Sequence, residues 1–132
     1  MVHATIATVT MKSHVPLEVA RFWRDLLGYR VEPNHSNSVL LVGDGQPALL
    51  IQPSAEQVKP GAIHLDIRPK DQAACVARAV ELGARPADIG QTGDDGWVVM
   101  VDPGGNLFCV LRSRADHLRL VTENPGTSTQ LD

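Results

Sequence analysis

The chain has 132 residues and a mass of 14.2 kDa, which suits a single domain with its own buried core. Twelve basic against fifteen acidic side chains give a net charge of −3, which argues against a nucleic-acid-binding protein. Two cysteines, Cys75 and Cys109, make no disulfide framework and favour a reducing, cytoplasmic location. No run of about 20 apolar residues would span a membrane, and the first residues lack a secretion-signal pattern.

The first half of the chain predicts a strand, a helix and three more strands. Residues 5–11 alternate between an apolar side and a mixed side, which is typical of a strand. Pro16 fits the first turn of a helix with apolar residues at three- and four-residue spacing, and Gly28 fits its end. The strands expected next are short and separated by turn-forming residues: 29–32, 38–42 and 48–52.

The same order of elements returns after a linker at residues 54–60. Residues 63–68 alternate, so His64, Asp66 and Arg68 share one face of a predicted strand. Asp71 can cap a second helix, which ends at Gly83. Three further strands are expected at residues 84–89, 97–101 and 107–111, the last two joined by a tight turn. Residues 114–132 form a polar tail that we expect to be partly disordered.

A direct internal repeat supports this division. LLGYR at residues 26–30 parallels ELGAR at residues 81–85, which begins 55 positions later. The pattern predicts an α+β fold with two βαβββ modules, residues 3–53 and 61–112, within one domain of residues 1–113. Each module has one helix for four strands, so one face of each sheet remains uncovered. That face must pack on the other module or a second chain, or line a cavity.

Three segments carry a family resemblance: FWRDLLGY at residues 22–29, IHLDI at 63–67, and WVVM at 97–100 with DPGGNLFCV at 102–110. Together they resemble the vicinal oxygen chelate superfamily, which includes glyoxalase I, bleomycin and fosfomycin resistance proteins and extradiol dioxygenases. The nearest branch is the glyoxalase-like domain. The resemblance covers roughly residues 5–111. It implies two cupped mixed sheets around a small-molecule site, and a homodimer or a pairing of the modules.

The resemblance also implies where a metal would bind, because metal-dependent members hold a divalent ion with His and Glu side chains. The corresponding positions here are Thr8, Leu50, His64 and Cys109, so only His64 retains an expected ligand. A catalytic metal usually needs about three protein ligands. We therefore expect no metal; if one binds, His64 with Cys109 would hold it. Asp66 is a third candidate, although it lies roughly 7 Å further along the strand backbone.

The mixed faces of the strands provide the candidate binding residues. We expect the ligand to contact Thr8, Thr10, Leu50, Gln52, His64, Trp97 and Cys109. His64 and Asp66 are the candidate catalytic residues for acid/base chemistry; the alternative for His64 is a partly buried, hydrogen-bonded side chain. Cys109 is either a nucleophile paired with His64 or a small apolar filler. Trp97 lies at a cavity rim, at a dimer interface or in the core.

These observations leave three hypotheses for function. The first is a metal-independent protein that binds a small molecule, to sequester a drug or metabolite or to carry out mild acid/base chemistry, with no cofactor. The second is a metal-dependent lyase, isomerase or dioxygenase with a rearranged ligand set. The third is a non-catalytic dimerising module, which predicts no cavity beside His64.

Overall fold

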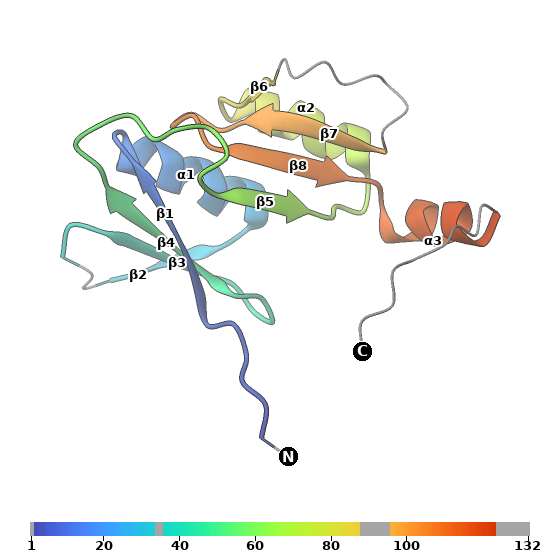
Figure 1. Ribbon diagram of the computed structural model, residues 1–132, viewed down its shortest axis with the longest axis horizontal. Coiled ribbons are helices and arrows are strands. Elements are labelled where there is room, and N and C mark those ends of the chain that lie inside the picture. The colour runs from blue at the N-terminus through green and yellow to red at the C-terminus, as the bar shows by residue number, and fades with distance from the viewer. Residues whose placement is uncertain (1, 34–35, 88–95, 124–132) are drawn as a thin grey trace.

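The computed structural model describes residues 2–33, 36–87 and 96–123 (Figure 1). It confirms the α+β class and the two βαβββ modules. The first module comprises β1 (Thr8–Ser13), α1 (Pro16–Leu27), β2 (Arg30–Glu32), β3 (Val39–Val42) and β4 (Ala48–Pro53). The second comprises β5 (His64–Ile67), α2 (Gln72–Glu81), β6 (Arg85–Pro86), β7 (Trp97–Val101) and β8 (Leu107–Leu111), and α3 (Arg114–Glu123) follows. In the described ranges, no helix is long and apolar enough to cross a membrane.

Each module forms its own four-stranded mixed sheet. Sheet A has the order β1-β4-β3-β2 and sheet B the order β5-β8-β7-β6. In both, the first strand pairs in parallel with the last strand of the module, and the other pairs are antiparallel. The register sets Asp66 beside Cys109 and Thr10 beside Leu50. Side chains that alternate along adjacent strands therefore reach the same face.

The residues predicted to begin the two helices, and the glycine predicted to end the first, do so in the structure. Pro16 begins α1, and Gly28 ends it in the left-handed conformation with φ of +71°. Asp71 caps α2 by accepting a hydrogen bond of 3.0 Å from the backbone N–H of Ala74. In Figure 1 both helices lie behind the strands, so they cover one face of the two sheets and leave the opposite face open.

One hydrophobic core joins the modules. Trp23 of α1 lies edge-on to Phe108 of β8, with ring centroids 5.0 Å apart, and Phe22 packs beside both rings. All three rings are buried. The helix of the first module therefore packs on the sheet of the second, which explains why modules of this size form one unit.

The turn between β7 and β8 adds a polar connection to this core. Asp102 is fully buried and accepts a hydrogen bond of 2.9 Å from the indole N–H of Trp23. Its other oxygen accepts the backbone N–H groups of Gly104 and Asn106, also at 2.9 Å. The predicted tight turn is confirmed, but no sequence pattern indicated the bond between Asp102 and Trp23, a residue 79 positions earlier.

Several predicted boundaries were wrong. The first strand was expected at residues 5–11, but it begins at Thr8 and runs to Ser13, because it pairs with β4 along that whole length. In the segment expected at 84–89, only Arg85–Pro86 is strand, and residues 88 and 89 lie outside the described part of the chain.

The predicted polar tail begins with a helix that the sequence analysis did not expect. The hydroxyl of Ser113 accepts the backbone N–H of Asp116 at 3.1 Å and so caps α3. No residue of α3 is buried, which is why its sequence lacked a clear apolar stripe. The disorder expected further along the tail concerns residues 124–132, which lie outside the described part of the chain.

Candidate functional site

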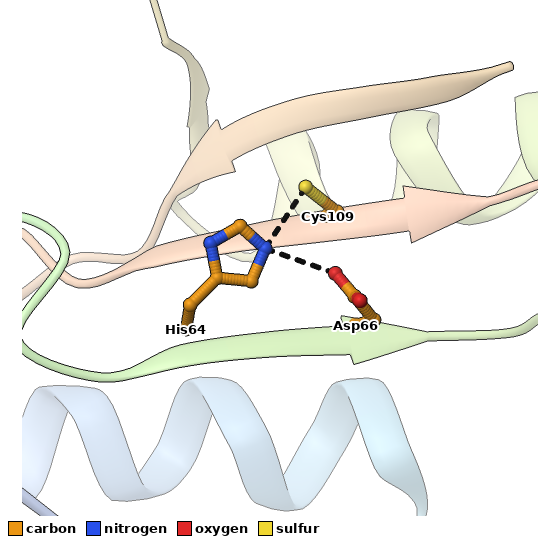
Figure 2. Close-up of side chains that lie close together, drawn as sticks. All are labelled: His64, Asp66 and Cys109. Atoms are coloured by element: carbon orange, nitrogen blue, oxygen red, sulfur yellow. Dashed lines mark hydrogen bonds and ion pairs between the residues drawn. The ribbon is translucent and has the colours of Figure 1, made fainter. Parts of the chain in front are cut away.

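Three polar side chains converge on the open face of sheet B. The Nε2 atom of His64 lies 2.9 Å from Oδ1 of Asp66 and 3.1 Å from Sγ of Cys109 (Figure 2). His64 and Asp66 alternate along β5, and Cys109 is the partner of Asp66 on β8, so strand pairing alone brings them to one face. All three residues were predicted from the sequence as site candidates, and the structure places them together.

Asp66 is closer to the other two groups than its backbone position suggested. The expected separation of roughly 7 Å applies to backbone atoms two residues apart on a strand. The His64 imidazole lies over the sheet with Nε2 toward the Asp66 carboxylate (Figure 2). The possible ligand atoms of the three residues all lie within 4.8 Å of one another.

One imidazole nitrogen serves both contacts, which restricts the proton arrangement. A carboxylate only accepts hydrogen bonds, so Nε2 carries the proton when it bonds to Asp66. The thiol of Cys109 then lies beside a donor that is already engaged. The His64 and Asp66 side chains remain 44% and 55% exposed, so a ligand on the sheet can reach this hydrogen-bonded acid/base pair.

Cys109 differs from its two neighbours because it is buried. Burial, followed by the negative charge of Asp66 and a hydrogen bond to it, raises the pKa of the Cys109 thiol to about 11. The thiol is therefore protonated near neutral pH, where only a thiolate is a good nucleophile. Of the two alternatives for Cys109, burial and the raised pKa favour the packing role over the nucleophile, although the contact with His64 means that the side chain is not a purely apolar filler.

An open groove of about 360 Å³ lies over these residues. Its lining comprises His64, Asp66, Trp97, Cys109 and Leu111. Trp97 is 46% exposed, which places it at the rim rather than in the core. Leu111 was not proposed from the sequence, although alternation along β8 from Cys109 could have identified it.

Four other predicted contact residues do not line this groove. Thr8, Thr10, Leu50 and Gln52 lie on the open face of sheet A, where β1 and β4 pair in parallel. Thr8 and Thr10 are exposed, and Leu50 and Gln52 are partly buried. Alternation along the strands assigned these four residues to the correct face of their sheet. Whether that face and the open face of sheet B form one site depends on how the two sheets are arranged, which strand pairing does not specify.

A larger hollow of about 460 Å³ lies elsewhere, between α1 and the segment that follows α2. Glu18, Arg21, Asp25 and Arg85 contribute charges of both signs to its lining. It contains no imidazole and no thiol, whereas the groove on sheet B combines both with a carboxylate and an indole. The smaller groove is therefore the better candidate functional site.

Comparison with known proteins assigns the family. Residues 8–111 match the model of the glyoxalase-like domain, so the chain belongs to the glyoxalase-like domain family. This confirms the resemblance seen in the sequence. No curated protein matches the chain.

Solved structures share the fold at low sequence identity. An antibiotic-binding protein from Streptomyces sp. CB03234, TnmS3, is 18% identical with a TM-score of 0.62, over 86% of this chain and 98% of that one. Glyoxalase I from Leishmania major is 15% identical with a TM-score of 0.66, over 92% and 95%. A glyoxalase/bleomycin resistance protein/dioxygenase family enzyme from Burkholderia phytofirmans is 15% identical with a TM-score of 0.61, over 83% and 98%. At these identities the matches establish the fold, which hosts both binding proteins and enzymes.

Proposed function

We propose that this protein binds a small organic molecule in the groove on sheet B, without a metal ion. The observation that carries the proposal is the combination, in one groove of about 360 Å³, of the exposed His64–Asp66 pair with the apolar surfaces of Trp97 and Leu111. A mostly apolar hollow with a few convergent polar groups is the usual form of a small-molecule site. The groove also counts against a purely dimerising module, which predicted no cavity.

The polar groups define what the site does chemically. With Nε2 of His64 bonded to Asp66, its Nδ1 atom can accept a proton from a ligand hydroxyl, and the protonated ring can then donate to a ligand carbonyl. The protonated thiol of Cys109 shapes the floor of the groove without attacking the ligand. We propose tight binding as the main activity, with slow proton transfer on bound molecules as the only chemistry.

The test is to identify what the purified protein carries. Mass spectrometry after denaturation should detect a stoichiometric organic molecule, and elemental analysis of the same sample should detect no stoichiometric transition metal. Replacing Trp97 by alanine should remove the organic molecule, whereas replacing Leu17, an exposed residue of α1, should retain it. Bound zinc, nickel, iron or manganese at one ion per chain would overturn the metal-independent proposal.

The second candidate is the metal-dependent enzyme, favoured by one observation. His64, Asp66 and Cys109 offer nitrogen, oxygen and sulfur atoms within 4.8 Å of one another, a donor set that zinc accepts. A bound ion would act as a Lewis acid toward substrate oxygens. His64 and Cys109 would have to give up their mutual contact, and the thiol would have to lose its proton. If dialysis against a chelator abolishes an activity that zinc restores, this candidate replaces the first.

We also propose that the chain forms a homodimer. The open faces of both sheets carry exposed residues, among them Thr8, Thr10 and Asp66, and none of the described helices lies over them. A second copy that set its sheet A against this sheet B would bring Thr10 and Leu50 toward the groove. Light scattering at micromolar concentration should give twice the chain mass of 14.2 kDa. A particle of 14.2 kDa would overturn the proposal.

A further inference from the structure

The groove beside His64 continues into a second hollow. A hollow of about 280 Å³ lies next to it, lined by Arg68, Gly96, Trp97, Leu111, Arg112 and His117. Trp97 and Leu111 belong to the linings of both hollows, so the two adjoin at these side chains. Together they form a longer groove along β5 and β8, with an apolar middle and two polar ends.

The two ends carry different charges. At one end the Asp66 carboxylate contacts His64. At the other end lie two guanidinium groups, Arg68 and Arg112, with His117 beside them. Among the described residues, neither arginine forms a salt bridge, and the carboxylate of Asp116 on the nearby α3 pairs with Arg119 instead. Within residues 2–33, 36–87 and 96–123, the far end of the groove therefore presents positive charge with no carboxylate paired to it.

A hydrogen bond to the backbone holds the Arg68 guanidinium, and the Arg112 guanidinium lies beside the backbone at Gly96. Nη1 of Arg68 donates a hydrogen bond of 2.7 Å to the carbonyl of Arg112, and within the described part of the chain its other N–H groups have no hydrogen-bond partner. The Arg112 guanidinium lies against Gly96, where an added Cβ would be 2.7 Å from its Cζ atom. Gln72 supports that turn by donating to the carbonyls of Gly96 and Val110. A positioned guanidinium loses less freedom on binding than a mobile one.

We propose that the ligand of this groove is an elongated organic anion. Its apolar or aromatic body lies on Trp97 and Leu111, and its carboxylate or sulfonate is bound by Arg68 and Arg112. Guanidinium groups suit this role because their planar N–H donors match paired anionic oxygens. Along the strand, the backbone of Arg68 lies about 13 Å beyond that of His64 and about 7 Å beyond that of Asp66. The inference rests on the proposed function, since it names the ligand class of the same groove.

Two dyes that differ only in charge test the inference. 1-Anilinonaphthalene-8-sulfonate is an aromatic anion, and N-phenyl-1-naphthylamine has the same rings without the sulfonate. Fluorescence titration should show that the intact protein binds the anion about tenfold more tightly than the neutral dye. Added salt should weaken the binding of the anionic dye and leave the binding of the neutral dye unchanged.

Variants assign the difference to the arginines. Arg68→Gln should weaken the affinity for the sulfonate dye about tenfold and change the affinity for the neutral dye less than about twofold. Arg68→Lys should retain part of the preference for the anionic dye. Arg112→Gln should act like Arg68→Gln, and it keeps the backbone carbonyl that Arg68 uses, so it serves if Arg68→Gln fails to fold. The matched control is Arg30→Gln, which replaces an exposed arginine on β2 of sheet A. It should leave the affinities for both dyes unchanged.

The outcomes separate the inference from the proposed function. If both dyes bind equally and neither arginine variant alters them, the groove binds molecules but does not select anions, and the inference is wrong. If Trp97→Ala leaves both dyes unchanged, or if neither dye binds, the groove is not a small-molecule site, and the proposed function is wrong with it.

Discussion

Two polar clusters beside β8 use the same kind of carboxylate for different purposes. Asp102 is fully buried, and both its oxygens accept hydrogen bonds from Trp23, Gly104 and Asn106. Asp66 is 55% exposed at its side chain and contacts His64 on the open face of sheet B. A buried carboxylate with all its partners stabilises the fold, because removing it leaves several donors unpaired. An exposed carboxylate with spare acceptor capacity is available to a ligand.

The largest expected effect comes from breaking the buried cluster. Asp102→Ala leaves the indole N–H of Trp23 without its partner inside the core that joins the modules. We expect the free energy of unfolding to fall by about 3 kcal/mol, measured by urea denaturation. Asp44→Ala, at a side chain 96% exposed, is the control and should change it by less than about 0.5 kcal/mol. Equal losses in the two variants would contradict a structural role for Asp102.

The next effect concerns the thiol of the exposed cluster. The pKa of Cys109 is raised to about 11 from an ordinary 9.0, so the folded protein should contain about a hundredfold less thiolate near neutral pH than a free thiol. Iodoacetamide should label Cys109 slowly at pH 8, with a rate that rises toward pH 11. A Cys75→Ala background isolates the signal. If Cys109 is labelled faster than free cysteine at pH 8, the thiol is reactive, and the hypothesis that Cys109 is a nucleophile would replace the packing role.

The same thiol makes stability depend on alkaline pH. Its raised pKa means that the unfolded chain loses this proton near pH 9, whereas the folded chain keeps it until about pH 11. This contribution to stability is complete below pH 9 and is lost as the pH rises to about 11. Cys109→Ala should reduce the loss of stability across that interval in urea titrations; an unchanged pH dependence would contradict the assignment.

A smaller effect should follow from crowding the turn that holds Asp102. A Cβ added at Gly104 would lie 2.5 Å from Cγ2 of Val19 and 2.6 Å from Oγ of Ser13, both in the first module. Gly104→Ala should therefore lower the free energy of unfolding by about 1–3 kcal/mol, because the modules must separate slightly. Thermal and urea unfolding would measure it. A variant as stable as the parent would indicate that the contact between modules is loose.

The smallest expected effect on stability is at the exposed cluster. Asp66→Asn should change the free energy of unfolding by less than about 0.5 kcal/mol, since the side chain is half exposed. It should also lower the pKa of Cys109, because the Asp66 charge is one cause of the raised value. The labelling rate of Cys109 against pH would detect the change. A loss of stability as large as that of Asp102→Ala would remove the contrast between the clusters.

Local patterns predicted most of the fold. Alternation and helical spacing placed both helices and most strands, since they depend on neighbouring residues. The internal repeat then predicted two modules with open sheet faces. Strand lengths were less predictable: β1 extends to Ser13 because its partner β4 extends to Pro53. Helix α3 was missed because it buries no apolar face.

The candidate site was predicted only in part, because alternation shows which face of a strand a residue occupies but not how separate sheets are arranged. Alternation identified the face that carries His64, Asp66 and Cys109, and the structure brings these three together. The same pattern also placed Thr8 and Thr10 at the ligand site, but they belong to a separate sheet and do not line this groove. The direction of the imidazole and the positions of Arg68 and Arg112 depend on contacts between strands and turns.

By itself the sequence determined the two modules, the caps of their helices and the faces of their strands, because each follows from residues a few positions apart. Only the tertiary structure decided that Asp102 supports Trp23, that Cys109 is buried beside His64, and that two arginines lie at one end of the groove. These arrangements join residues as much as 79 positions apart, and strand register and core packing determine them.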